Sequence, residues 1–135
     1  MKTVATSGYF DPLHVGHLES LELAKQLGDK LIVIVNSDLQ AKLKKGKSFM
    51  KQEDRIKIIA ALKCVDEVFL SIDKDKSQCE SLRYLKPTIF AKGGDRTSGE
   101  IPEAKVCKKL NIEIIDGLGA KIRSSSSLTG IKEIK

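Results

Sequence analysis

The sequence is poor in residues that mark several common protein classes. It contains no tryptophan, and aromatic residues make up only 4% of its 135 residues. So few rings leave little on which unpaired bases could stack, which argues against a single-stranded nucleic-acid surface. No apolar run approaches the length of a membrane span, and the apolar stretch at the N-terminus is too short for a signal peptide. We therefore expect a cytoplasmic protein that binds neither nucleic acid nor a membrane.

Cysteine and histidine are also scarce. Cys64, Cys79 and Cys107 lie far apart and form no CxxC pair, which is typical of reduced thiols, and we expect them on buried helix faces. The two histidines lie close together, but no cysteine or glutamate stands at a recognised zinc spacing from them. A zinc site, the alternative interpretation of this pair, lacks its third ligand. We expect no metal site made of protein ligands.

The remaining composition is that of an ordinary globular chain, with 41% hydrophobic and 31% charged residues. Its length suits one compact domain, and no repeat or linker marks a second one. The formal net charge of +6 fits either a polyanion such as nucleic acid or a site for phosphorylated small molecules. The scarcity of aromatic residues favours the small molecules.

Apolar strands alternate with amphipathic helices along the chain. We expect strands at residues 3–7, 31–35, 67–71, 88–91 and 112–115, and helices at 15–27, 52–63, 78–85, 103–110 and 128–134. A lysine-rich loop is expected after the second strand. The β-branched run at 31–35 is typical of a strand buried on both faces of a parallel sheet. The alternation predicts a single α/β domain over residues 1–135, Rossmann-like, with a five-stranded parallel sheet flanked by helices.

The most informative motif is GYFDPLHVGH at residues 8–17, which joins the first strand to the first helix. It places His14 and His17 three residues apart, so both imidazoles lie in the first turn of that helix. Unpaired backbone N–H groups and the positive end of the helix dipole attract anions there, and the imidazoles add directed donors. Gly16 has no Cβ and lets a phosphate approach the backbone. The motif therefore indicates a phosphate site.

Three further segments are placed where they could meet the same ligand. KGGD at residues 92–95 follows the fourth strand, its glycines permit close approach, and Asp95 can accept from a ribose hydroxyl or a base. The serines at 124–127 supply hydroxyl and N–H groups at the start of the last helix, a second anion site, with Arg123 beside them. A basic cluster follows the second strand and comprises Lys42, Lys44, Lys45 and Lys47.

Together these motifs resemble those of the HxGH-bearing cytidylyltransferase-like nucleotidyltransferases. The resemblance covers nearly the whole chain and includes segments 28–38, 52–55, 65–68, 92–95 and 124–127. It implies transfer of a nucleoside monophosphate from an NTP to a phosphorylated small-molecule acceptor, with release of pyrophosphate. Mg²⁺ would arrive with the NTP as the cofactor. Members of the family are often dimers, so a homodimer is a further expectation.

The resemblance also assigns roles to residues. The catalytic set would be His14, His17, Lys44 and Lys47, which would stabilise the charge that develops during transfer. The nucleotide would contact Gly8, Tyr9, Phe10, His14, Gly16, His17, Lys92, Gly94, Asp95, Ser124, Ser125 and Ser126. The acceptor substrate would contact Asp11, Asp38 and Arg55. Which of the four clustered lysines reaches the phosphates stays open at this point, as does the role of Arg123.

Two branches of the family differ in nucleotide and acceptor. Similarity at residues 35–38 and 85–101 to the heptose-1-phosphate adenylyltransferase domain of lipopolysaccharide-core biosynthesis favours ATP and a sugar 1-phosphate. Tyr9 departs from that branch, where a small residue is more usual. CTP-dependent glycerol-3-phosphate and phosphocholine cytidylyltransferases are the alternative, but the RTE of their RTEGIST motif is missing here. FAD synthetases match KGGD less well, and a non-catalytic nucleotide-binding module is the alternative of a different class.

Overall fold

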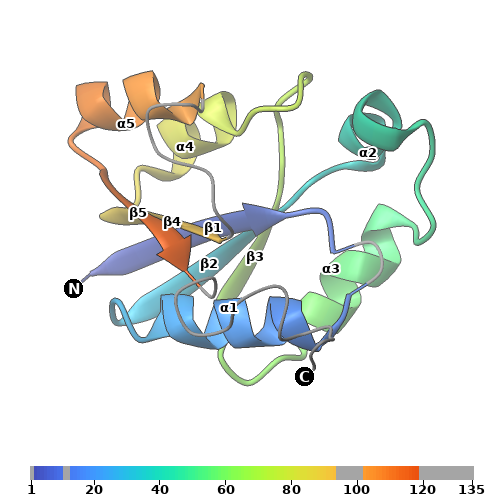
Figure 1. Ribbon diagram of the computed structural model, residues 1–135, viewed down its shortest axis with the longest axis horizontal. Coiled ribbons are helices and arrows are strands. Elements are labelled where there is room, and N and C mark those ends of the chain that lie inside the picture. The colour runs from blue at the N-terminus through green and yellow to red at the C-terminus, as the bar shows by residue number, and fades with distance from the viewer. Residues whose placement is uncertain (1, 11–12, 94–101, 119–135) are drawn as a thin grey trace.

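The computed structural model describes residues 2–10, 13–93 and 102–118, in which strands and helices alternate as expected (Figure 1). The elements follow one another as β1 (Thr3–Gly8), α1 (Val15–Lys25), β2 (Lys30–Val35), α2 (Asp38–Lys45), α3 (Gln52–Ala60), β3 (Glu67–Leu70), α4 (Cys79–Leu85), β4 (Ile89–Gly93), α5 (Glu103–Leu110) and β5 (Glu113–Leu118). The helix expected at 128–134 lies outside the described residues.

The described strand pairs are all parallel, and the strands lie in the order β3-β2-β1-β4-β5. The chain moves outward from β1 through β2 to β3 and then returns to β4 on the other side of β1. At the junction of β1 and β4 the connections leave toward opposite faces. This opens a crevice at the carboxyl edge, where open α/β sheets bind ligands. The predicted five-stranded parallel sheet flanked by helices is confirmed.

Helices cover both faces of the sheet, with α1 and α3 on one side and α4 and α5 on the other (Figure 1). Successive residues of a strand point to opposite faces, so each strand feeds two core clusters. On β2, Val33 packs in the cluster that contains Leu21 of α1 and Ile59 of α3. Its neighbour Ile34 packs in the other cluster with Leu82 of α4. The central strands are therefore fixed from both sides, and only their carboxyl ends remain open to a ligand.

Helix α2 corrects the expectation of a loop after the second strand. Ser37 caps the helix by accepting from the N–H of Gln40, and the Gln40 side chain accepts from the N–H of Ser37 in return. Gly46 ends the helix with a φ of 86°, a conformation that glycine adopts without strain. The reciprocal cap outweighs the high lysine content, which is compatible with a helix whose charged side chains face water. Three of the four clustered lysines are therefore helical, namely Lys42, Lys44 and Lys45.

The other boundaries differ by a few residues, because helix ends fray and are defined by caps. Helices α1 and α3 end earlier than predicted, at Lys25 and Ala60.

The three cysteines differ in their placement. Cys107 lies buried on α5 as expected, whereas Cys64 follows α3 in a turn and Cys79 begins α4, both half-buried. Burial raises the pKa of the Cys107 thiol to about 11. None of the helices described is long and apolar enough to cross a membrane.

Adjacent isoleucines on α3 offer a matched test of this packing. Ile59 is 0% exposed and Ile58 is 40% exposed. We expect Ile59→Ala to lower the free energy of unfolding by about 2–5 kcal/mol, because it leaves a cavity in the core, and Ile58→Ala to cost less than about 1 kcal/mol. Urea unfolding followed by circular dichroism measures both. Equal losses for the two variants would contradict the arrangement of α3.

Candidate active site

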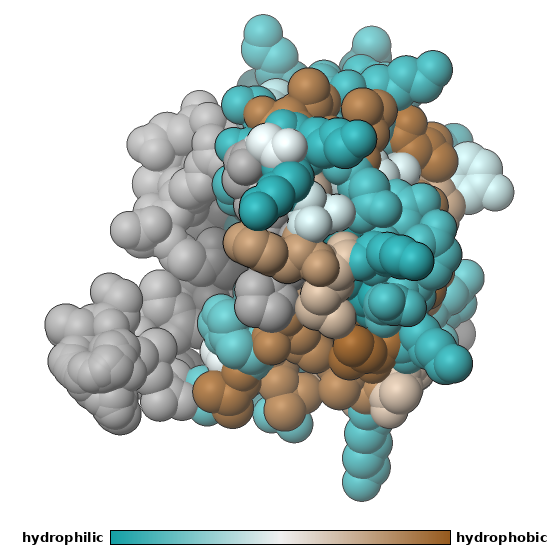
Figure 2. All heavy atoms as spheres, turned by 90° about the vertical axis from the view of Figure 1, so that its right-hand side faces the viewer, coloured by the Kyte–Doolittle hydropathy of each residue, from teal (hydrophilic) through white to brown (hydrophobic). Residues whose placement is uncertain are grey.

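A pocket of about 1200 Å³ lies at the carboxyl edge of the sheet. Its walls come from the ends of β1 and β2, helix α2, the loop that follows β3, and the start of α4 and α5. Figure 2 looks toward this side of the molecule and shows hydrophilic side chains over much of it, with apolar side chains below the centre and again near the top. The pocket therefore occupies the place that the sheet topology favours for a ligand.

The two histidines cap helix α1 reciprocally. The Nδ1 of His14 accepts a hydrogen bond from the N–H of Gly16 at 3.1 Å, and the Nδ1 of His17 accepts from the N–H of His14 at 3.2 Å. Their rings stack with centroids 4.0 Å apart. Because both Nδ1 atoms are acceptors, each neutral ring carries its proton on Nε2. The cap thus leaves two Nε2–H donors at the helix N-terminus, where an anion is favoured.

His17 is held in its neutral form by its surroundings. Burial, and next the neighbouring His14, lower its pKa to about 4. Its ring meets Phe10 edge-on, with centroids 5.2 Å apart. Phe10 is buried with a φ of 53°, and a Cβ on Gly8 would lie 2.7 Å from its ring. Phe10 therefore packs against His17, and Gly8 leaves room for the Phe10 ring and also lines the pocket. The nucleotide contacts expected of Gly8 and Phe10 stay predictions.

Arg55 is buried, with 1% of its surface exposed, and joins the loops at the carboxyl edge. Its guanidinium donates to the carbonyls of Tyr9 (2.8 Å), Asn36 (2.6 Å) and Met50 (3.0 Å). It also pairs with a carboxylate oxygen of Asp38 at 2.7 Å. The residues expected to hold the acceptor, Asp38 and Arg55, thus contact each other. A buried guanidinium needs such partners, because an unpaired charge in the interior is costly.

The structure brings one of the two predicted catalytic lysines to the pocket. Lys44 lines it, and its Nζ lies 4.6 Å from the centroid of the Tyr9 ring, within reach of a cation–π contact. Lys47 follows the end of α2, and its Nζ lies 5.5 Å from the Phe49 ring centroid instead. Lys92 of β4 also lines the pocket. Of the clustered lysines, position therefore favours Lys44 for a phosphate.

Several predicted site residues lie outside the described residues. They are Asp11, Gly94, Asp95, Ser124, Ser125 and Ser126, and their roles stay predictions. Gly16 is described, and a Cβ there would lie 3.0 Å from the His14 ring. A glycine at this position therefore also gives the His14 cap its room.

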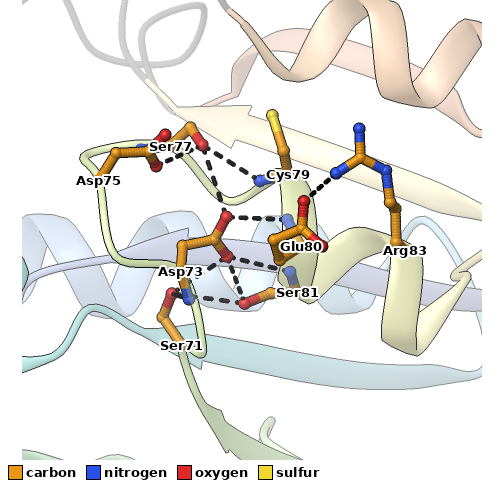
Figure 3. A network of polar contacts seen from close by, with 8 residues as sticks. All are labelled: Ser71, Asp73, Asp75, Ser77, Cys79, Glu80, Ser81 and Arg83. Carbon is orange, nitrogen blue, oxygen red and sulfur yellow. Dashed lines mark hydrogen bonds and ion pairs between the residues drawn. The ribbon is translucent and has the colours of Figure 1, made fainter.

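The loop between β3 and α4 is a wall of the pocket that the sequence did not reveal (Figure 3). The buried carboxylate of Asp73 accepts from the N–H groups of Glu80 (2.8 Å) and Ser81 (2.9 Å) and from the Ser81 hydroxyl (2.8 Å). It therefore caps α4 from a distance, since the N-cap residue Gln78 makes no side-chain cap of its own. The alternation of aspartate and serine at residues 71–77 was the available signal, because both types cap and turn the backbone.

Neighbouring elements hold this wall in place. The Gln40 side chain of α2 donates to the carbonyls of Asp75 (2.8 Å) and Ser77 (3.0 Å). On the other side, the Glu103 carboxylate of α5 accepts from the N–H of Gln78 at 2.7 Å. The pocket is thus preformed between α2 and α5. Within the described part of the chain, no group of three or more histidine, cysteine or carboxylate side chains could hold a metal ion.

A family model described as cytidylyltransferase-like matches residues 5–133. The chain belongs to the cytidylyltransferase-like family. Its members are nucleotidyltransferases, so the expected class of enzyme is confirmed. The capped HxGH turn of this cytidylyltransferase-like chain joins β1 to α1 at the carboxyl end of β1, and His14 and His17 are not among the residues that line the pocket.

Curated relatives and a solved structure show which members of the family this chain is similar to. The cytidylyltransferase-like chain is 38% identical over 119 residues to "Bifunctional protein HldE" of Nitratiruptor sp., covering 86% of this chain and 25% of that protein. It is 41% identical over 124 residues to the protein of the same name from Syntrophotalea carbinolica, covering 85% of this chain and 24% of that one. The chain therefore spans about a quarter of the length of these relatives.

The solved structure is that of a lipopolysaccharide core biosynthesis protein from Thermoplasma volcanium. The two share a TM-score of 0.74 and 30% identity, and the match covers 86% of this chain and 95% of that one. A protein that matches almost end to end has the same fold, and the predicted Rossmann-like nucleotidyltransferase architecture is confirmed.

The histidine pair predicts an unusual titration. We expect His17 of the cytidylyltransferase-like chain to titrate near pH 4 rather than at its ordinary value of 6.5. Because its pKa is lower in the folded than in the unfolded state, the stability it contributes is complete above about pH 6.5 and is lost as the pH falls toward 4. NMR titration of the imidazole signals, with His17→Gln for assignment, measures the midpoint. A midpoint close to 6.5 would contradict the burial of this ring.

The buried guanidinium gives a second test. We expect Arg55→Met to lower the free energy of unfolding by about 3–5 kcal/mol, because it leaves Asp38 and three carbonyls without their donor. Arg55→Lys restores only part of the loss, since an ammonium cannot reproduce the planar fork. The control is Arg83→Met, which breaks only an exposed pair with Glu80 and costs less than about 1 kcal/mol. Unchanged stability of Arg55→Met, together with weaker acceptor binding, would show instead that Arg55 faces the substrate.

Proposed function

We propose that this chain transfers AMP from ATP to the phosphate of a sugar phosphate and releases pyrophosphate. The observation that carries the proposal is the reciprocal histidine cap, which presents two Nε2–H donors beside the N-terminus of α1 at the carboxyl edge. ATP and a sugar phosphate are favoured by the sequence similarity at residues 35–38 and 85–101 to heptose-1-phosphate adenylyltransferase domains. The match to a lipopolysaccharide core biosynthesis protein supports the same acceptor class.

In the reaction, an oxygen of the acceptor phosphate attacks the α-phosphorus of ATP. A bond forms between them as the bond to the bridging oxygen of pyrophosphate breaks, so no covalent enzyme intermediate is needed. His14 and His17 donate from Nε2 to oxygens on which negative charge grows, and Lys44 adds positive charge. A neutral imidazole serves as a donor without taking a proton, and an ionised acceptor phosphate needs no general base. The residues thus align and stabilise the reacting groups.

The two substrates divide the carboxyl edge between them. We place the acceptor in the pocket between α2 and the loop after β3, where Lys44, Lys74 and Lys76 supply positive charge. The nucleotide lies toward β4, where Lys92, Gly94 and Asp95 and the serines at 124–126 are its proposed contacts. In this proposal the phosphate groups of both substrates meet at the histidine cap.

Magnesium in this proposal is bound by the triphosphate, since the described residues provide no cluster of ligands for it. Bound there, it would neutralise charge on the leaving pyrophosphate. An enzyme that consumes ATP works where ATP is abundant, so we place it in the cytoplasm. A homodimer without nucleic acid as a partner completes the proposal.

The first experiment is a grid of nucleotides and acceptors. Pyrophosphate release is measured with ATP, CTP, GTP and UTP, each against heptose 1-phosphate, glycerol 3-phosphate, phosphocholine and FMN, with magnesium present. We expect activity with ATP and the sugar phosphate. Activity with CTP and glycerol 3-phosphate or phosphocholine would replace the proposal by the cytidylyltransferase alternative, and activity with FMN by the FAD synthetase alternative. Nucleotide binding without turnover in any combination would indicate a binding module.

Variants of His17 distinguish its proposed role as a hydrogen-bond donor to phosphate from its role in capping helix α1. We expect His17→Ala to lower kcat by about 100- to 1000-fold, the loss typical of one transition-state donor, and also to weaken helix α1. His17→Glu keeps an acceptor for the N–H of His14, as in ordinary capping boxes, but an ionised carboxylate has no donor, so this variant should retain stability and still lose activity. Thermal unfolding and steady-state kinetics measure the two effects. If both variants keep activity within tenfold, His17 is not a catalytic residue.

A further inference from the structure

Gln78 has an unusual environment at the wall of the pocket. It precedes α4, lines the pocket, and is 3% exposed. Within the described part of the chain, its Oε1 is the buried side-chain polar atom that has no hydrogen-bond partner. A buried acceptor without a donor costs free energy, and most such atoms in folded proteins are satisfied by protein, water or a ligand. Because Gln78 lines the pocket, this unsatisfied acceptor points to a ligand atom as its partner.

The rest of Gln78 is fixed. Its N–H donates to the Glu103 carboxylate at 2.7 Å, and its Nε2 donates to the Oδ1 of Asn36 at 3.1 Å. Asn36 is itself buried, and its side chain hydrogen-bonds the Tyr9 phenol, which partly opposes the rise that burial causes in the Tyr9 pKa. The side-chain hydrogen bonds from Tyr9 through Asn36 to Gln78 determine which atom of each amide donates and which accepts. They leave Oε1 of Gln78 without a donor.

The chemistry of this atom selects the group that it binds. Oε1 only accepts, so its partner must donate, and an ionised phosphate has no proton to give. A hydroxyl is the natural partner. Binding of the acceptor phosphate falls to Lys44, Lys74 and Lys76, which line the same pocket. The nearby carboxylates are engaged elsewhere, with Asp73 on α4, Glu103 on Gln78 and Glu80 on Arg83. The pocket therefore suits a molecule with both phosphate and hydroxyl groups.

We propose that Gln78 is a specificity-determining residue that accepts a hydrogen bond from a hydroxyl of the acceptor. The inference rests on the proposed function, which places the acceptor in this pocket. It separates polyhydroxylated phosphates, which carry the required donor, from phosphocholine, which carries none. A site built to pair with a hydroxyl rejects analogues that lack it, because its own polar atom is then left unpaired.

The test couples a change in the protein to a change in the ligand. Gln78→Met has a similar length and no hydrogen-bonding group. We expect it to lower kcat/KM for the sugar phosphate about tenfold, mainly through KM, and to leave KM for ATP within about twofold. The matched control is Gln26→Met, an exposed glutamine at the end of α1, which should change neither value.

The second part of the test uses acceptors that each lack one hydroxyl. For the acceptor that lacks the hydroxyl bound by Gln78, kcat/KM should fall about tenfold in the native enzyme, relative to the complete acceptor, and hardly at all in Gln78→Met. Removal of any other hydroxyl should lower kcat/KM equally in both proteins. A merely structural role of Gln78 would not produce this coupling. The proposal is overturned if every hydroxyl matters to the same degree in both proteins.

A binding measurement keeps the inference separate from the proposed function. If the native enzyme turns over none of the acceptors, the proposed function fails, and the side-chain amide signal of Gln78 is followed by NMR instead. This signal is identified by its loss in Gln78→Met. A shift with heptose 1-phosphate but not with phosphocholine supports the role of Gln78. No shift with either, or equal shifts with both, overturns it.

Discussion

The buried guanidinium of Arg55 is the constraint on which the carboxyl edge depends. It reaches the histidine motif through the Tyr9 carbonyl, the end of β2 through the Asn36 carbonyl, and the start of α2 through Asp38. These segments belong to separate loops, whose relative positions would not be fixed without a shared partner. One planar group with several donors holds them at defined distances. The distance between the histidine cap and Lys44 of α2 is thus set from inside the protein.

The two imidazoles that cap helix α1 are also the proposed donors to the ligand. Each imidazole gives one nitrogen to the backbone and keeps the other for a ligand, so correct folding of α1 also selects the tautomer. The low pKa of His17 follows from the same packing. A free histidine pair at a surface would titrate near neutrality and rotate. Here both rings are preorganised donors, so the phosphate binding that we propose would require no further reordering of them.

The sequence predicted the elements that follow from periodicity and missed what depends on packing. The apolar run at residues 31–35 identified β2, and the GYFDPLHVGH motif identified the turn from β1 into α1. Helix α2 was not predicted although Ser37 and Gln40 form a recognisable capping box, because a lysine-rich segment is equally compatible with a solvated loop. The buried state of Arg55 was not predictable, since its partners Asp38, Asn36 and Tyr9 lie 17, 19 and 46 residues away. The open oxygen of Gln78 depends on side-chain positions that no spacing encodes.

The Gln40 side chain links two walls of the pocket, helix α2 and the loop after β3. Its Oε1 completes the cap of α2, and its Nε2 holds the carbonyls of Asp75 and Ser77 in the opposite wall. A single rotation of this side chain would uncap the helix and free the loop at once. The two walls are therefore mechanically linked, and widening the mouth for a bulky ligand requires breaking three hydrogen bonds together. Access to the pocket is in this sense a cooperative event, governed by a residue that is not itself among those lining the pocket.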